Sequence, residues 1–346
     1  MTPRRQAGSG RLVQRAIAAA FALAWLGLAP ATAQEADPLV PALAEARALV
    51  DAGRAREAVS KLKALDTTAP RVAQLLGVAY YHADQYVLAI DTLRPLLDRL
   101  PADSPEHREA EQVLGLSLYV AGRFPEALPL LERTRRWGAG NQELNQVLGM
   151  TYIQLHRPDE AREAIARLFG VAPESAGARV LTAQLMIRLE MEAMAEAELK
   201  KAVELDPRIP RAHYLLGQQA IFRGRLDEGI ALTRRELAIN PSDAMAFYQL
   251  GDALGRQLKW DESIAALQHS LLLNPFYSGP FILLGRAYAK KGQPVTAEGM
   301  LRQAIQYDPN NRTAHYMLAQ VLQQLGRTEE ATREFELAEK LPGLRE

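Results

Sequence analysis

The sequence predicts an all-α protein in which about nine helix–turn–helix repeats stack into a solenoid. Two regular spacings within its 346 residues carry this prediction. A proline recurs every 34 residues, at Pro173, Pro207, Pro241, Pro275 and Pro309. A leucine–glycine pair also recurs, with its glycine at Gly77, Gly115, Gly149, Gly217, Gly251 and Gly285. Self-similarity with a period of about 20–50 residues is the signature of repeat architectures.

One repeat, residues 244–277, shows why this pattern makes a helix pair. Phe247, Gly251 and Leu254 share one face of the first helix, because residues three, four and seven apart are neighbours on a helix. The glycine has no side chain, so the second helix can approach closely at that point. Asn274-Pro275 ends the second helix, since proline disfavours helical geometry in the residue before it. Glycines that tolerate the left-handed conformation are expected in the turns within the pairs, at Gly122, Gly224, Gly292 and Gly326.

This pattern of prolines and glycines resembles that of the tetratricopeptide repeat (TPR) family, whose unit is a helix–turn–helix of about 34 residues. The resemblance implies a right-handed superhelix with a concave groove. We number the repeats 1 to 9 and count positions from the first residue of each repeat. The repeats are expected near 39–69, 70–103, 108–141, 142–175, 176–209, 210–243, 244–277, 278–311 and 312–346. The first and the last depart most from the pattern, as capping repeats do.

Residues 1–33 have the order of a secretory signal peptide. Basic residues precede an apolar run at 16–28, and Ala31-Thr32-Ala33 has the small-x-small pattern of a cleavage site. The run is too short for a stable membrane span, which needs about 20 residues. We expect cleavage after Ala33, a short linker at 34–38, no membrane span in the mature chain and a periplasmic or secreted location. Retention of the segment as an N-terminal anchor is the alternative.

The composition argues against several classes of function. The 41 basic and 41 acidic residues balance, whereas a nucleic-acid-binding protein usually has a basic excess. The absence of cysteine excludes disulfides, thiol catalysis and cysteine metal sites. The six histidines lack the spacing of a helical metal site, and no known catalytic motif is present. We therefore expect no enzymatic activity, no cofactor, no metal and no nucleic-acid partner.

Two further features receive structural interpretations. His213 and His315 occupy a position that usually holds a large aromatic residue in this family, which predicts that they pack in the core. Residues 133–137 hold the densest basic cluster, three arginines followed by a tryptophan. A single cluster of this kind is weak evidence for nucleic-acid binding, and a solvated surface is the simpler interpretation.

The candidate binding surface is a stripe on the first helices, at positions 5, 9 and 12 of the repeats. By resemblance, this stripe lines the concave groove. It is rich in tyrosine, which offers a large contact with a polar tip, and in glutamine, which both donates and accepts hydrogen bonds. The alternative is that these are merely tolerated polar residues on an exposed face. The candidate residues are Tyr81, Tyr119, Gln146, Gln184, Tyr214, Gln218, Tyr248, Asp252, Arg286, Tyr316 and Gln320.

The predicted function is that of an exported, non-catalytic scaffold that binds proteins or extended peptides in the groove. Position 9 has no asparagine, so the carboxylate clamp of chaperone-binding family members is not expected. Position 6 lacks the asparagine ladder of the glycosyltransferase-linked members. The alternative is a structural component of an envelope assembly, such as polysaccharide export or pilus biogenesis. A third interpretation, an enzyme with an unfamiliar site, requires clustered titratable groups that the sequence does not show.

Overall fold

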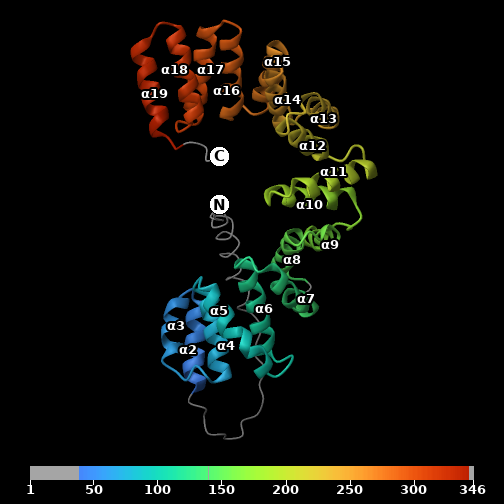
Figure 1. Cartoon of the computed structure of the whole chain (residues 1–346), viewed down its shortest axis with the longest axis vertical. Coiled ribbons are helices and arrows are strands. Elements are labelled where there is room, and N and C mark those ends of the chain that lie inside the picture. The colour runs from blue at the N-terminus through green and yellow to red at the C-terminus, as the bar shows by residue number, and fades with distance from the viewer. Residues whose placement is uncertain (1–38, 139, 343–346) are drawn as a thin grey trace. The chain divides into compact units, whose positions relative to one another are not determined.

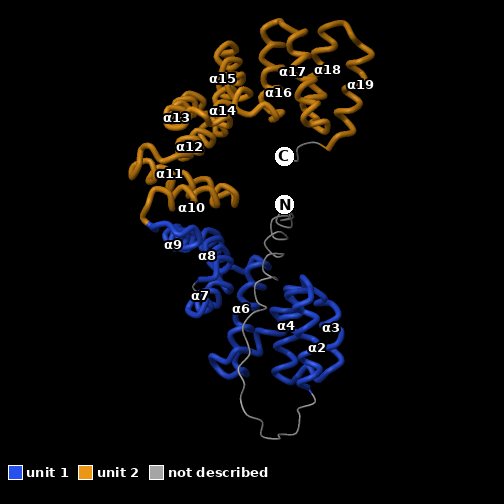
Figure 2. The backbone as a smooth tube through the Cα atoms, turned by 180° about the vertical axis from the view of Figure 1, so that it is seen from behind, with its two compact units in different colours: residues 1–173 blue, residues 174–346 orange. Residues whose placement is uncertain are grey.

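The structure, a computed structural model, describes residues 39–138 and 140–342. Over these residues it contains eighteen α-helices, one short 3-10 helix and no strand, which confirms the all-α solenoid fold. The predicted signal peptide and linker, residues 1–33 and 34–38, lie outside the described residues. The chain divides into two compact units, residues 1–173 and 174–346, which are coloured separately in Figure 2.

Unit 1 contains the helix pairs of repeats 1 to 4 (Figure 1). Each helix packs against the next one along the chain, and the first helices of adjacent repeats also touch one another. In repeat 2 the second helix continues as the 3-10 helix η1 (Arg94–Arg99). The pairs are α2 (Leu39–Asp51) with α3 (Ala55–Lys63), α4 (Pro70–His82) with α5 (Tyr86–Leu93), α6 (Pro105–Val120) with α7 (Phe124–Gly138), and α8 (Gln142–Gln154) with α9 (Pro158–Phe169).

Unit 2 contains the helix pairs of repeats 5 to 9, with the same packing order. The first helices α12, α14, α16 and α18 form a continuous row, because each contacts the next. The pairs are α10 (Ala176–Arg188) with α11 (Glu192–Leu205), α12 (Ala212–Phe222) with α13 (Leu226–Ile239), α14 (Ala244–Arg256) with α15 (Trp260–Leu273), α16 (Ser278–Lys290) with α17 (Pro294–Tyr307), and α18 (Arg312–Gln324) with α19 (Thr328–Lys340).

The glycine at position 8 allows the two helices of a pair to approach closely. A Cβ atom added at Gly251 would lie 2.5 Å from Cγ of Leu267, and one added at Gly285 would lie 2.6 Å from Cγ of Leu301. Both leucines are completely buried. A larger residue at position 8 would therefore push the second helix away, at a cost of about 1–3 kcal/mol.

The turn within every pair places position 15 in the left-handed region of backbone space. The amide of position 16 then donates to the carbonyl of position 11, as Arg225 does to Ala220 at 2.8 Å. This is the hydrogen bond of a Schellman cap. Glycine fills position 15 in five repeats, including the four predicted turns. The position-15 residues, all with positive φ, are Gly53, Asp84, Gly122, His156, Glu190, Gly224, Leu258, Gly292 and Gly326.

Arginine–glutamate pairs connect the second helices of successive repeats. An arginine at position 16 pairs with a glutamate at position 19 in repeats 1, 3, 4, 6 and 9. An arginine at position 25 reaches the position-19 glutamate of the next repeat three times. These cross-repeat pairs are Arg94–Glu126 at 2.7 Å, Arg234–Glu262 at 3.0 Å and Arg302–Glu330 at 3.3 Å.

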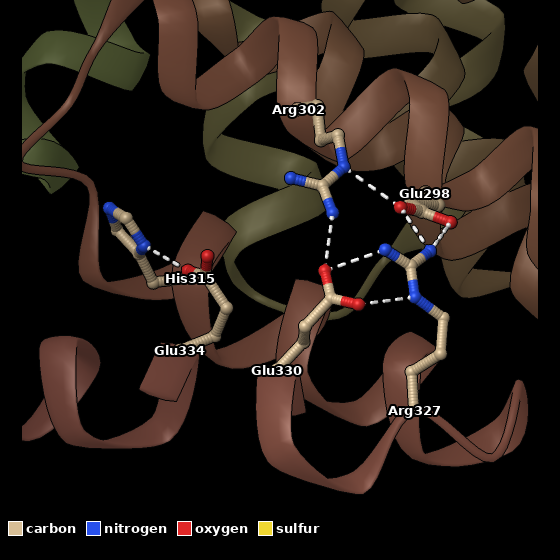
Figure 3. Close-up of polar contacts among 6 residues, drawn as sticks. All are labelled: Glu298, Arg302, His315, Arg327, Glu330 and Glu334. Carbon is tan, nitrogen blue, oxygen red and sulfur yellow. Dashed lines mark hydrogen bonds and ion pairs between the residues drawn. The ribbon is translucent and has the colours of Figure 1, made fainter. Parts of the chain in front are cut away.

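Repeats 8 and 9 are joined by the most complete of these networks (Figure 3). Glu298 accepts hydrogen bonds from Arg302 at 2.8 Å and from Arg327 at 2.7 Å. Glu330 pairs with the same two arginines, at 3.3 Å and 2.6 Å. Burial opposes ionisation of Glu298, but the hydrogen bonds from both arginines outweigh it and lower the pKa of this carboxyl. Two carboxylates thus share two guanidinium groups across the last repeat junction.

Candidate functional site

In unit 1 the side chains of the stripe at positions 5, 9 and 12 are mostly buried or half-buried. Tyr81 is buried, with its ring 5.8 Å from that of Tyr86. Tyr119 is half-buried, and its hydroxyl lies 3.3 Å from Sδ of Met150, a position-9 residue of the next repeat. Burial raises the pKa of Tyr119 to about 12, so its hydroxyl stays protonated. Gln146 is half-buried. The stripe of unit 1 therefore offers little exposed polar surface.

The first part of the unit 2 stripe is also unevenly exposed. Tyr214 is only 5% exposed, and the Arg211 guanidinium lies 4.6 Å from its ring centre. Gln184 is half-buried, while Gln218 is exposed. The stripe was expected to be an exposed lining, but Tyr81 and Tyr214 contribute to packing instead. The reason lies in their neighbours, because the rings of His82 and Tyr86 lie against Tyr81 and the Arg211 guanidinium lies over Tyr214.

Tyr248 is held against the junction of repeats 7 and 8. Its ring lies 5.2 Å from the ring of Tyr277, in an edge-on arrangement. Gly279 permits this contact, because a Cβ atom there would lie 2.8 Å from Cζ of Tyr277 and 3.1 Å from Cε2 of Tyr248. Burial, reinforced by Tyr277, raises the pKa of Tyr248 well above its ordinary value. The Tyr248 hydroxyl is therefore protonated and able to donate a hydrogen bond.

The two charged residues of the stripe, Asp252 and Arg286, are brought together by the stacking of α14 and α16. The Asp252 carboxylate lies 3.4 Å from the Arg286 guanidinium and 2.8 Å from that of Arg256. Gly255 packs beside them, since a Cβ atom there would lie 3.2 Å from Oγ of Ser263, 3.7 Å from Cζ3 of Trp260 and 3.9 Å from Nη2 of Arg286. The Asp252 carboxylate thus pairs with two guanidinium groups, which leaves a net positive charge on this group of three residues.

The most accessible part of the stripe is on α18. Tyr316 is 50% exposed, and its ring lies 5.4 Å from that of Phe335. Gln320 is exposed one turn further along the same helix. Because α16 contacts α18, these residues continue the row that begins with Tyr248 and Asp252. We call Tyr248, Asp252, Arg286, Tyr316 and Gln320 the C-terminal stripe.

Two buried histidines on the first helices make specific hydrogen bonds. His213 and His315 are buried, and each ring Nε2 lies 3.0 Å from the carbonyl oxygen of the preceding inter-repeat proline. A carbonyl only accepts, so Nε2 carries a proton. Nδ1 of His315 pairs with Glu334 at 2.6 Å (Figure 3). The predicted packing positions of both histidines therefore also make specific hydrogen bonds.

Glu236 is a buried carboxylate that the sequence analysis did not identify. It is completely buried and accepts hydrogen bonds from the amides of Arg211 at 2.8 Å and Tyr214 at 3.1 Å. It thereby caps the N-terminus of α12 from the second helix of the same repeat. The available signal is its position, 27, which holds alanine or serine in repeats 5, 7, 8 and 9.

The described residues contain no group of three histidine or acidic side chains that could hold a metal ion. Within the same part of the chain, no helix combines the length and apolar character that crossing a bilayer requires. The C-terminal stripe instead combines two tyrosine hydroxyls, a glutamine amide and a guanidinium group. These groups can pair with the main-chain amides and carboxylates of a peptide.

The sequence matches family models of the tetratricopeptide repeat at residues 118–185 and 288–340, and at residues 193–244. No curated protein matches the chain.

Several solved structures are similar in fold. A crystal structure of MamA is 22% identical, with a TM-score of 0.43, and the match covers 46% of this chain and 92% of MamA. MamA from Desulfovibrio magneticus RS-1 is 20% identical, with a TM-score of 0.45 and coverage of 48% and 94%. The Cut9–Hcn1 hetero-tetramer of APC/C contains a chain that is 17% identical, with a TM-score of 0.45 and coverage of 81% and 55%.

Proposed function

Because this chain belongs to the tetratricopeptide repeat family, we propose that it is a non-catalytic scaffold that binds an extended segment of a protein partner along the C-terminal stripe. Members of this family are protein-interaction scaffolds. What we propose beyond this is that the partner binds at the C-terminal stripe and is recognised by the polar and aromatic side chains there. The first helices α14, α16 and α18 support this location, because α16 contacts both α14 and α18 and the three helices form one row.

The observation that carries the proposal is the exposed surface of Tyr316 and Gln320 on α18, with the half-buried Arg286 on the adjacent helix α16. Tyr316 is half exposed, although tyrosines at the same stripe are buried in other repeats. Gln320 can pair with both the amide and the carbonyl of an extended backbone. Arg286 shares Asp252 with Arg256, so its guanidinium retains the capacity to bind an acidic group.

We further propose that the protein acts in the cell envelope, after export. The support is the signal-peptide pattern of residues 1–33, whose cleavage after Ala33 stays a prediction. A role as a structural component of an envelope assembly, such as polysaccharide export or pilus biogenesis, is the second candidate. In that case the partners would include several assembly subunits rather than one dominant client.

Site-specific photo-crosslinking tests the binding surface. A photoreactive phenylalanine derivative is placed at Tyr316, and in a matched control at Phe222, which is 84% exposed at the end of α12. We expect a discrete protein adduct at Tyr316 and none at Phe222. Adding Arg286→Ala and Gln320→Ala to the Tyr316 probe should reduce the adduct by about tenfold, with an unchanged thermal melt.

Equal adducts at both probe positions, or an adduct that the two alanines leave unchanged, would contradict binding at the C-terminal stripe. If mass spectrometry then identified a set of envelope-assembly subunits, the second candidate would be favoured. That result would also mean that the partners use a different surface of the chain.

A further inference from the structure

A basic pocket lies in unit 1, between the end of α7 and the helix α9. Its volume is about 470 Å³, and it is lined by Glu132, Arg135, Arg136 and Arg167. The first three residues come from the last turns of α7, and Arg167 comes from α9. The pocket therefore lies on the second helices of repeats 3 and 4. It uses none of the residues of the stripe on the first helices.

The pocket has an excess of positive charge, because three arginines and one glutamate line it. Its one carboxylate, on Glu132, accepts a hydrogen bond from the Tyr152 hydroxyl at 2.7 Å. Arg167 pairs with Glu163 at 3.0 Å, outside the pocket lining. Arg135 and Arg136 have no ion-pair partner among residues 39–138 and 140–342. Two adjacent guanidinium groups thus face an open space with their donors uncommitted.

Other arginines of unit 1 are neutralised by glutamates. At the second-helix starts, the position-16 arginines of repeats 1, 3 and 4 all pair with glutamates. Cations at a helix C-terminus are favoured by the helix dipole, which accounts for the presence of Arg135 and Arg136 near the end of α7. The dipole does not account for the convergence of Arg167, from another helix, on the same pocket.

We infer that this pocket binds a short acidic segment of a protein partner, through the carboxylates of two or more Asp or Glu side chains. The planar guanidinium fork fits a carboxylate with two hydrogen bonds, so Arg135 and Arg136 can engage one carboxylate each. Trp137 follows directly and is 39% exposed, which provides an apolar contact for the residues beside the acidic ones.

The charge of the surrounding unit favours a protein segment over a larger polyanion. Residues 39–173 include 16 basic and 17 acidic side chains, so the unit as a whole has no basic excess. A nucleic acid or an anionic membrane presents charge over a wide area and is bound by an extended basic surface. A local pair of uncommitted arginines matches a local pair of carboxylates instead.

Fluorescence anisotropy with a defined peptide tests this inference. The probe is a labelled peptide, Gly-(Asp-Glu)3-Gly, and its matched control replaces every acid with Asn or Gln. We expect the full chain to bind the acidic peptide and not the neutral one. The affinity should fall as sodium chloride is raised from about 50 to 300 mM, since salt screens exposed charges.

Two double variants with the same change in net charge locate the site. Arg135→Glu with Arg136→Glu should weaken binding of the acidic peptide by at least about tenfold. The control, Lys201→Glu with Arg235→Glu, changes two exposed residues of unit 2 and should alter the affinity by less than about twofold. Circular dichroism checks that both variants remain folded.

Three outcomes would overturn the inference. They are absence of binding to the acidic peptide, an equal loss in both double variants, and sedimentation of the chain with phosphatidylglycerol vesicles that depends on Arg135 and Arg136. The last outcome would assign the pocket to a membrane surface. The two proposals are tested with different probes, the acidic peptide here and the crosslink at Tyr316 above, so failure here is distinguishable from failure of the proposed stripe.

Discussion

Leu258 holds a backbone conformation that an L-amino acid rarely adopts. Its φ is 62°, and its side chain is 69% exposed, so no packing of the side chain explains the choice of leucine. Glycine occupies the equivalent turn position in five other repeats. The left-handed conformation costs a residue with a side chain about 1–2 kcal/mol, which glycine avoids.

Leu258→Gly should therefore raise the free energy of unfolding, by about 0.5–1 kcal/mol after the larger chain entropy of glycine is subtracted. Urea unfolding followed by circular dichroism measures the change. Leu272→Gly is the matched control, because Leu272 is also largely exposed but lies inside α15. It should lower the free energy of unfolding by about 1 kcal/mol. Destabilisation by both substitutions would contradict the assignment of strain to Leu258.

At the scale of elements, ion pairs fix how one helix pair sits on the next. Glu196 on α11 accepts hydrogen bonds from Lys200, at 2.8 Å, and from Arg223, which follows α12. These two hydrogen bonds lower the pKa of Glu196 to about 2, from an ordinary value of 4.5. The contact thus joins repeats 5 and 6 through a carboxylate that stays ionised in mild acid.

The pKa of Glu196 is lower in the folded chain than in the unfolded chain, so the folded state is favoured when this group is ionised. The stabilisation is complete above about pH 4.5 and is lost as the pH falls toward about 2. We expect Glu196→Gln to lower the free energy of unfolding by about 1 kcal/mol at pH 7 and by progressively less below pH 4.5.

Denaturant melts of Glu196→Gln across this pH range measure the effect. Glu204→Gln provides the control on the same helix, because Glu204 is exposed and has no ion pair among the described residues. Its difference from the native chain should stay near zero at every pH. A constant difference for Glu196→Gln would mean that the glutamate contributes through packing rather than through its charge.

At the scale of the whole molecule, the repeat pattern was predictable because each signal acts within a few residues. Proline ends a second helix, position 8 sets the helix spacing, and position 15 sets the turn, wherever they occur. Exposure of the stripe was not predictable in this way. Tyr214 and Tyr316 share position 5, yet one is buried beneath Arg211 and the other is half exposed, because different neighbours surround them.

The same distinction explains which polar features the sequence did not show. The Arg-x-x-Glu motif is local and was available, but its pairing with position 25 requires two stacked repeats. Glu236 caps a helix 25 residues earlier in the chain, and the pocket at Arg135 and Arg136 needs Arg167 from the next repeat. Period and helix position follow from one repeat, whereas binding chemistry follows from contacts between repeats.

The packing order predicts how the molecule responds to a local defect. Helices that pack extensively against one another are immediate or next-but-one neighbours in the chain. In such an array, stability is close to a sum of repeat and junction contributions, and the ends can open separately. Leu322 on α18 is completely buried in the cluster formed by repeats 8 and 9.

Leu322→Ala should therefore destabilise repeats 8 and 9 by about 2–5 kcal/mol and leave unit 1 unaffected. Hydrogen–deuterium exchange with peptide resolution should show faster exchange across 278–342 and unchanged exchange across 39–173. Leu272→Ala, an exposed leucine, should change neither region. Uniformly faster exchange along the whole chain would show that the repeats unfold as one cooperative body. Local opening, by contrast, would mean that the C-terminal stripe can loosen while the basic pocket of unit 1 keeps its geometry.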